Sequence, residues 1–369
     1  MKLVQLERDA LLKPLQAVTG IVEKRHTLPI LSNVLIERKQ GRLQLVATDL
    51  EIQVATSADA GKLSAEDSSL TVSARKLQDI LRALPDAAEA TLDVQNNRLQ
   101  VRSGKSRFNL QTLPSTDFPS MADPGAVQAK IAVPQKAFRE LLLLVQYAMA
   151  QQDIRYYLNG LLLVLDGGQV KVVATDGHRL SYAARPLGQQ PEKREVILPR
   201  KAVLELGRLL GDAEEAVSIE IFPNLVRFSF GNIVLTTKII DGKFPDYTRV
   251  VPTTYQKRFT IKRQVLLQSL QRAAILSNEK FRGVRWMMGA NSLRISCTNN
   301  EQEEAQEELE VAYGGDALDI GFNITYLLDV LNNVQSDDIE CAFGDANSSM
   351  LVTVPDNPEF RYVVMPMRI

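Results

Sequence analysis

Asp176 and His178 are the residues whose types and spacing most suggest chemistry, because a carboxylate two residues from an imidazole could act as an acid–base pair. Asp49 stands in the same Thr-Asp context earlier in the chain, and no histidine follows it closely. A role in a turn therefore explains Asp176 better than catalysis does. The sequence also lacks the GxxxxGK[ST], GxGxxG, HExxH and GxSxG motifs, so we expect no catalytic residue.

The cysteines and the apolar segments bear on cofactors and location. Cys297 and Cys341 are the only cysteines and form no CxxC pair, so neither a disulfide framework nor a zinc site with paired cysteines is expected. Met1–Gln5 lacks the apolar block of a signal peptide, and the stretch around Leu141–Val145 is too short to span a bilayer. We expect a cytoplasmic protein with no metal, no cofactor and no membrane partner.

A strand that ends in Thr and is followed by Asp or Asn occurs three times in the chain. The copies are Leu43–Thr48, Val170–Thr175 and Leu293–Thr298, and their threonines are 127 and 123 residues apart. Apolar residues recur at spacing two in each copy, as in a half-buried strand. The sequence therefore predicts one unit of about 120 residues that is repeated three times.

The same elements surround each copy in the same order: a helix, a strand and turn, the Thr strand, a second helix and three final strands. The first helices are expected at Arg8–Thr19, Gln135–Gln151 and Lys262–Ser277, and the second helices at Arg75–Leu84, Arg200–Leu210 and Thr325–Val334. The strands before the Thr strands are expected at Asn33–Glu37, Leu161–Leu165 and Val284–Met288. The final strands are expected at Ala90–Val94, Arg98–Ser103, Arg107–Leu113, Val217–Ile221, Leu225–Phe230, Ile233–Lys238, Ile339–Phe343, Ser349–Val354 and Arg361–Met365.

This pattern predicts an α+β fold made of three similar domains. The expected domain boundaries are residues 1–123, 124–252 and 253–369. Three such units fill the chain, which leaves no room for a separate catalytic domain.

Charge is distributed unevenly between the expected helices and the rest of the chain. The chain has 43 basic and 44 acidic residues, but the six helical windows carry a net charge of +8, which leaves −9 elsewhere. The densest acidic run is Glu301–Glu310. If the helices share one side of the sheets, that side attracts a polyanion without reading its sequence. The alternative is that helix surfaces are simply often charged.

Five longer segments resemble the beta subunit of bacterial DNA polymerase III, and the resemblance runs over the full chain. They are Gln152–Gly160, Ala174–Leu180, Phe244–Tyr247, Ala273–Gly283 and Tyr362–Arg368. The resemblance implies a non-catalytic DNA sliding clamp, a processivity factor that closes as a head-to-tail homodimeric ring. Twelve helices would line a channel around duplex DNA, and antiparallel sheets would form the outside. The implied partners are a clamp-loader ATPase, the replicative polymerase alpha subunit, and other polymerases or repair proteins that bind through linear motifs.

The resemblance also implies a subunit interface. Phe108 and Leu110 on an edge strand are expected to meet Ile275 and Leu276 on a helix of the partner. From the residues alone, ordinary core packing is the simpler reading of all four. Subunits that join through two different surfaces form a closed ring only when the rotation from one subunit to the next adds up to a full circle. Three repeats in each of two chains give a pseudo-sixfold arrangement that meets this condition.

For DNA, the resemblance implies contacts from Arg25, Arg75, Gln152, Tyr156 and Tyr157. Arginine offers a planar fork to phosphate, and exposed tyrosines can stack on bases or bond to the backbone. The alternatives are a solvated loop for Arg25 and a strand core for Tyr157.

For partner proteins, the resemblance implies an apolar groove between the second and third repeats. It comprises Leu158, Thr175, Gly177, His178, Arg179, Leu180, Pro245, Arg249, Val250, Asn323, Tyr326, Ser349, Val363, Met365, Pro366, Met367 and Arg368. Methionine adapts to varied apolar anchors, and Arg179 or Arg368 could pair with a peptide carboxylate or carbonyl. The alternatives are that the terminal Val-Val-Met is only the buried face of the last strand, and that the chain is a repeat scaffold that binds proteins but no DNA.

Overall fold

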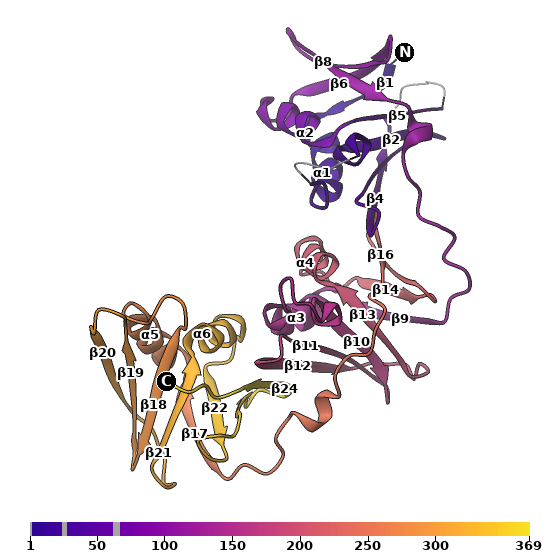
Figure 1. The fold of residues 1–369 in the computed structure, drawn as a ribbon. Coiled ribbons are helices and arrows are strands. Elements are labelled where there is room, and N and C mark those ends of the chain that lie inside the picture. The colour runs from indigo at the N-terminus through magenta and orange to yellow at the C-terminus, as the bar shows by residue number, and fades with distance from the viewer. Residues whose placement is uncertain (1, 24–27, 62–66) are drawn as a thin grey trace. The chain divides into compact units, whose positions relative to one another are not determined.

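The structure is a computed structural model that describes residues 2–23, 28–61 and 67–369 (Figure 1). The chain divides into two compact units, one made of Met1–Arg139 with Leu204–Ile239 and the other of Glu140–Val203 with Ile240–Ile369. The boundary between the units runs through two helices, α3 (Gln135–Val145) and α4 (Arg200–Leu209). None of the described helices is both long and apolar enough to cross a membrane.

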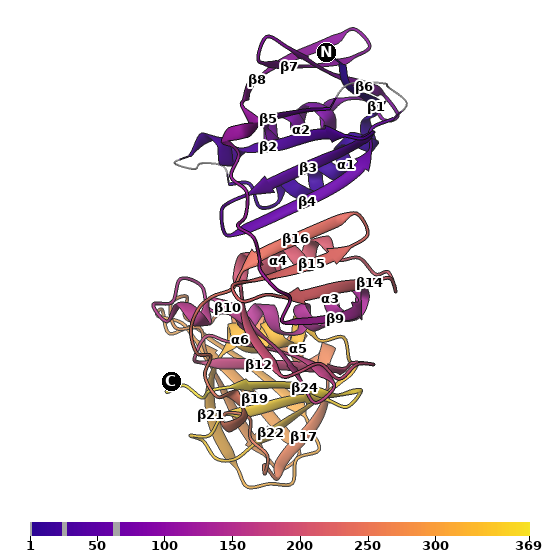
Figure 2. The same ribbon diagram turned by 90° about the vertical axis from the view of Figure 1, so that its right-hand side faces the viewer.

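The first unit contains one large antiparallel sheet and the helices α1 (Arg8–Thr19) and α2 (Ala74–Ala83), which pack against each other. Its strands are β1 (Lys2–Glu7), β2 (Asn33–Lys39), β3 (Arg42–Thr48), β4 (Ile52–Asp59), β5 (Ser68–Ser73), β6 (Glu89–Gln95), β7 (Arg98–Ser103), β8 (Ser106–Leu113), β9 (Ala129–Pro134), β14 (Ala216–Ile221), β15 (Leu225–Phe230) and β16 (Ile233–Lys238). Their order in the sheet is β1-β6-β7-β8-β5-β2-β3-β4-β16-β15-β14-β9 (Figure 2). The amphipathic face of α1 places Leu11, Leu15 and Val18 in the core.

The second unit contains two antiparallel sheets and the helices α5 (Arg263–Ala274) and α6 (Ile324–Asn333), which also pack against each other. Its strands are β10 (Gly160–Asp166), β11 (Gln169–Thr175), β12 (Arg179–Pro186), β13 (Arg194–Pro199), β17 (Lys257–Lys262), β18 (Gly283–Gly289), β19 (Ser292–Thr298), β20 (Glu304–Glu310), β21 (Leu318–Asn323), β22 (Asp338–Phe343), β23 (Met350–Val354) and β24 (Asn357–Val364). The sheet orders are β13-β10-β11-β12-β24-β23-β22-β17 and β20-β19-β18-β21.

The elements repeat three times in the same order, as the sequence predicted, and all six expected helices and fifteen expected strands are present in the described chain. Each repeat contains three further strands that the sequence analysis missed. One precedes the first helix, one follows the Thr strand, and one precedes the second helix. They are β1, β4, β5, β9, β12, β13, β17, β20 and β21.

Three predicted boundaries were wrong by three residues or more, and several others by one or two residues. The helix α3 ends at Val145, not Gln151, because Val145 leaves helical geometry at φ −127° and a single 3-10 turn, Gln146–Ala148, follows. The helix α5 ends at Ala274, so Ile275 and Leu276 lie in the turn that follows it rather than within it. The last strand, β24, begins at Asn357 instead of Arg361.

Neighbouring repeats are joined in the same way at both places in the chain: the strand that follows a Thr strand pairs with the last strand of the next repeat. In the first unit, β4 of the first repeat pairs with β16, the last strand of the second repeat. In the second unit, β12 of the second repeat pairs with β24, the last strand of the third. Among the described residues, β20 of the third repeat has no such partner, and β8 of the first repeat pairs beyond β7 only through Thr112 and Leu113. These two strands each leave an edge open.

The helices carry the positive charge that the sequence analysis assigned to them. With the observed bounds, α1 to α6 contain twelve Lys and Arg against five Asp and Glu, a net charge of +7 in a chain of −1. Lys13, Lys76, Arg82 and Lys136 are exposed on these helices. A polyanion that contacts the helices therefore meets a locally basic surface despite the neutral chain.

Candidate functional site

A repeated turn closes each of the first two Thr strands and determines what Asp176 does. Asp176 Oδ1 accepts hydrogen bonds from the backbone N–H of His178 at 2.9 Å and of Arg179 at 3.1 Å. Asp49 Oδ1 accepts from Glu51 N and Ile52 N in the same way, at 3.0 and 2.8 Å. The prediction that Asp176 serves a turn is confirmed, and its carboxylate is committed to that role.

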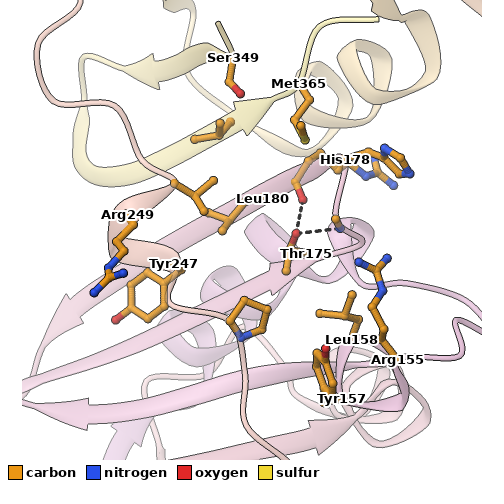
Figure 3. Close-up of a pocket in the computed structure, with 15 residues that line it drawn as sticks. Arg155, Tyr157, Leu158, Thr175, His178, Leu180, Tyr247, Arg249, Ser349 and Met365 are labelled. Carbon is orange, nitrogen blue, oxygen red and sulfur yellow. Dashed lines mark hydrogen bonds between the residues drawn. The ribbon is translucent and has the colours of Figure 1, made fainter.

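A cavity of about 470 Å³ opens beside this turn in the second unit (Figure 3). Twelve of the predicted groove residues line it: Leu158, Thr175, Gly177, His178, Arg179, Leu180, Pro245, Arg249, Val250, Ser349, Val363 and Met365. Three further lining residues, Arg155, Tyr157 and Tyr247, were not predicted to belong to the groove. Five residues that were predicted for it lie outside the lining: Asn323, Tyr326, Pro366, Met367 and Arg368. We call this cavity the groove.

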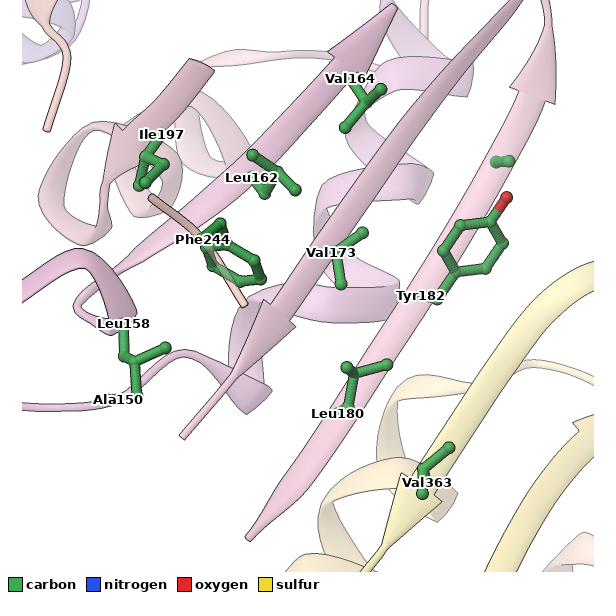
Figure 4. Close-up of a cluster of buried hydrophobic side chains, with 11 residues drawn as sticks. Ala150, Leu158, Leu162, Val164, Val173, Leu180, Tyr182, Ile197, Phe244 and Val363 are labelled. Carbon is green, nitrogen blue, oxygen red and sulfur yellow. The ribbon is translucent and has the colours of Figure 1, made fainter. Parts of the chain in front are cut away.

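The floor of the groove is the top of a buried apolar cluster (Figure 4). Leu180 on β12 is the register partner of Val363 on β24, so the floor spans the strand junction between the second and third repeats. Leu158 and Phe244 belong to the same cluster, and Tyr157 packs against it. Because the floor rests on packed side chains, the groove is preformed and presents apolar surface to a ligand.

The rim of the groove carries charge at two places. Arg249 is 86% exposed and pairs with Asp246 at 3.0 Å. Arg155 pairs with Asp153 at 2.8 Å, and its hydrogen bonds hold the pKa of the Asp153 carboxyl down at about 2. Burial raises the pKa of Tyr247 to about 12, so its phenol stays protonated at neutral pH. An apolar floor with polar groups at the rim suits an amphipathic peptide better than a small polar metabolite.

Arg179 supports the groove from below. Its guanidinium donates to Asp176 at 3.1 Å, to Asp329 at 2.6 Å and to the carbonyl of Tyr147 at 2.6 Å. It also lies 4.3 Å from the ring centroid of Tyr326 on α6. These contacts hold three elements together, so the donors of Arg179 that could pair with a peptide carboxylate or carbonyl are engaged within the protein in this structure.

Replacing Arg179 with alanine is expected to destabilise the protein by about 3 kcal/mol, because it leaves Asp176 and Asp329 without their buried partner. The measurement is the midpoint of urea unfolding. Arg249→Ala is the matched control, since its ion pair with Asp246 is open to solvent and its loss is expected to change the midpoint little. Equal midpoints for the two variants would show that the buried network contributes nothing to stability.

The residues predicted to contact DNA fall in three places. Gln152 and Tyr156 are exposed on the loop after α3, with Tyr156 at 58%, while Tyr157 on the same loop lines the groove. The loop is held by Asn159, whose side chain accepts from Asp153 N at 2.9 Å and donates to Asp153 O at 2.8 Å. Arg75 is exposed at the start of α2 and donates to the carbonyl of Val22 at 2.6 Å. Arg25 lies outside the described residues.

The four residues predicted to join two chains are not core residues. Phe108 and Leu110 are half-buried on β8, and Leu276 is half-buried in the turn after α5. Ile275 is 77% exposed. Ordinary core packing, the simpler reading of the sequence, does not describe these positions.

The thiols and the acidic residues do not form a reactive centre in the described part of the chain. Burial raises the pKa of Cys297 to about 11 and raises that of Cys341 further, so both stay protonated at neutral pH. The described residues hold no group of three or more His, Cys, Asp or Glu that could bind a metal ion.

Comparison with known proteins finds similarity to one protein family along almost the entire chain. Three family models match in succession, those of the N-terminal, central and C-terminal domains of the DNA polymerase III beta subunit, at residues 1–122, 132–246 and 248–368. The beta sliding clamp of Vibrio cholerae is 44% identical over 365 residues, which is 99% of each chain. The crystal structure of DNA polymerase III subunit beta from Pseudomonas aeruginosa is 44% identical, covers 100% of both chains and has a TM-score of 0.94. A Caulobacter crescentus beta sliding clamp, with polyethylene glycol bound to a candidate beta-motif tethering region, is 38% identical, covers 99% of this chain and 98% of its own, and has a TM-score of 0.93.

Proposed function

The chain belongs to the family of bacterial DNA polymerase III beta subunits, the beta sliding clamps, and on that basis we propose that it encircles duplex DNA as a head-to-tail homodimer. The family is that of the non-catalytic processivity subunit in DNA replication, with DNA and DNA polymerase as partners. The proposal concerns how this chain closes, which residues contact DNA and which ligand occupies the groove. We assign the three repeats to residues 1–123, 124–252 and 253–369, a division that the order of the family matches supports.

The observation that best supports a closed ring is that β20 and β8 each have an open edge among the described residues. Each internal junction joins the strand after a Thr strand to the last strand of the next repeat, as β4 joins β16 and β12 joins β24. Applied to the third repeat, the rule requires β20 to pair with the last strand of a following first repeat, which is β8 of a second chain. Two chains joined this way at both ends give six repeats in a closed circle.

The internal junctions also specify a register for the proposed contact. In the first junction, Gln53 lies opposite the last residue of the Thr strand and pairs with Thr236 of β16. In the second junction, Leu180 lies opposite the last residue of the Thr strand and pairs with Val363 of β24. Carried to the third repeat, this register sets Glu304 opposite Asn109 and Ala305 opposite Phe108. Residues that pair across two antiparallel strands point to the same face of the sheet, so this register also determines which side chains of β8 and β20 share a face.

This register is consistent with the apolar and charged residues at the two edges. Glu307 on β20 bonds to Ser269 and Arg272 of α5, so the odd-numbered residues of β20 lie on the face that α5 covers. Phe108 and Leu110 would then lie on that same face, beside Ile275 and Leu276. Lys105 and Arg107 would run along the acidic Glu301–Glu310 segment, which favours the contact and its direction.

Cysteine cross-linking tests this contact directly. Arg107→Cys and Gln306→Cys in one chain are expected to give a covalent dimer on mild oxidation, because the proposed register sets these residues opposite each other. The control pairs Arg107→Cys with Glu310→Cys, four residues out of register and roughly 13 Å away along the strand. The native thiols are buried and should not react. Cross-linking of the shifted pair as readily as the first, or of neither, would reject the register.

In the proposed ring, the basic helices face the DNA. Phosphate contacts from Arg75 and from the exposed helix lysines would bind without reading sequence, as a sliding protein requires. Gln152, Tyr156 and Tyr157 on their braced loop, together with Arg25, complete the proposed DNA site. Because the ring holds DNA topologically, these contacts need not be strong. A protein that acts on chromosomal DNA in this way works in the cytoplasm.

We assign the groove to linear motifs of partner proteins. Its apolar floor, with Leu180 and Val363 at the centre, suits one or two apolar anchors, and Met365 can adapt to different ones. The exposed Arg249 can meet an acidic residue at the rim. The ligands we propose are segments of the replicative polymerase alpha subunit, of other polymerases or repair proteins, and of a clamp-loader ATPase that opens the ring. The region named in the Caulobacter relative supports a site of this kind.

A further inference from the structure

The last residues of the chain cross the four-stranded sheet at a point where its strands carry glycine. Met367 N donates to the carbonyl of Gly321 on β21 at 2.8 Å, and the two residues form an isolated antiparallel bridge. A side chain at Gly321 would begin 2.5 Å from Met367 O and 2.6 Å from the side chain of Ile369. Real side chains do not tolerate such contacts, so the chain end can lie here only because residue 321 is a glycine.

The central repeat shows that a bridge of this kind does not by itself require glycine. Ile197 on β13 occupies the corresponding strand, and its partner in an isolated bridge is Ile240, in the segment that follows β16. Ile197 carries a full side chain that is buried in the apolar cluster under the groove. The backbone hydrogen bonds of the two bridges are alike, 2.9 Å for Ile240 N to Ile197 O and 2.8 Å for Met367 N to Gly321 O. The third repeat differs at the side-chain position, where Met367 O and Ile369 occupy the space that a side chain at 321 would need.

The same chain end forms one wall of the groove. Met365 lines the groove and is 49% exposed, and its backbone N donates to the carbonyl of His178 at 2.9 Å. Met365 and Met367 are thus tethered by backbone hydrogen bonds two residues apart, with Pro366 between them restricting rotation. A shift of Met367 away from β21 is transmitted over this short, stiff connection to the Met365 side chain.

We propose that Gly321 is a positioning residue for the groove: by admitting the chain end against β21, it sets where Met365 stands in the groove wall. Gly321 is not among the residues that line the groove, and it contacts Met367 and Ile369 rather than the ligand. This inference rests on the proposed function of the groove as a peptide site. Its ligand class is the same, a linear segment that places an apolar side chain against Met365.

Gly321→Ala is the test, with Gly283→Ala on the neighbouring strand β18 as the matched control. The new methyl group at 283 would lie 3.5 Å from Ile369, an ordinary van der Waals contact, whereas the one at 321 would displace the chain end. The probe is a fluorescein-labelled peptide with the C-terminal residues of the host's replicative polymerase alpha subunit, titrated against the full-length protein. We expect binding on the order of tenfold weaker for Gly321→Ala, as for one displaced apolar anchor, and within about twofold of the unchanged protein for Gly283→Ala.

A second comparison separates positioning from general damage to the sheet. Deleting Met367–Ile369 removes the residues that Gly321 accommodates but leaves Met365, so it should weaken peptide binding about as much as Gly321→Ala does. Combining the two changes should add no further loss, because each removes the same contact. Unchanged binding by Gly321→Ala, or losses that multiply in the combined variant, would overturn the inference alone. No binding by the unchanged protein would overturn the proposed function of the groove and this inference with it.

Discussion

Replacing Ile275 and Leu276 with alanine is expected to convert the protein from dimer to monomer at micromolar concentration. Ile275 is 77% exposed in the single chain, and Phe108 and Leu110 on β8 are only half-buried, so a second chain has apolar surface to cover at both edges. Burial of each truncated side chain stabilises one contact by about 2 kcal/mol, so losing both weakens each of the two interfaces of the proposed ring roughly a thousandfold. Sedimentation velocity measures the outcome.

Val265→Ala is the control for this variant. Val265 is also partly exposed on α5, but it lies at the opposite end of the helix from Ile275. It should leave the dimer intact, and both proteins should retain the same far-ultraviolet circular dichroism because none of these side chains is in the core. A dimer that survives the double change would show that the interface lies elsewhere.

Deleting Met365–Ile369 is expected to abolish binding of a polymerase-tail peptide, weakening it more than about a hundredfold. The deletion removes Met365 from the groove wall and both backbone tethers of the chain end, and it exposes the floor around Val363. The edges of β8 and β20 are untouched, so the dimer should form as before. Fluorescence anisotropy and sedimentation on the same preparation measure both properties.

Arg368→Ala distinguishes loss of the groove wall from loss of a charge. Arg368 lies outside the lining of the groove, so its removal should leave peptide affinity within about twofold. An equal loss for Arg368→Ala and for the deletion would mean that the peptide is held by this charge instead. Retained affinity after the deletion would remove the chain end from the binding site.

The helices and the Thr strands were predictable because their periodicity is strong and occurs three times. The nine strands that were missed have six to eight residues, so they are no shorter than those that were predicted, but six of them pass directly into the helix that follows. The strand β17, for example, runs from Lys257 to Lys262 and passes into α5 without an intervening turn, so its last residue was taken for the start of the helix. Such a strand is defined by its partner β22 more than by its own sequence.

The groove was predictable in its strands and less so in its loops. Thr175 and Val363 belong to strands that the repeats predicted, and both line it, whereas Leu180 lies on β12, a strand that was not predicted. Arg155 and Tyr247 were missed because they belong to the loop after α3 and the segment after β16, which are positioned by contacts such as that of Asn159 with Asp153. The ion pair of Arg179 with Asp329 was not predictable for the same reason, since the two residues are distant in sequence.

The central claim is that the protein holds DNA by surrounding it, and retention on plasmid DNA tests this most directly. The protein is loaded by its clamp loader onto a nicked circular plasmid, excess protein is removed by gel filtration, and half of the sample is cut once with a restriction enzyme. A ring should stay on the circle at a salt concentration that breaks phosphate contacts and should slide off the linear form. Equal retention on the circular and the linear plasmid would contradict encirclement.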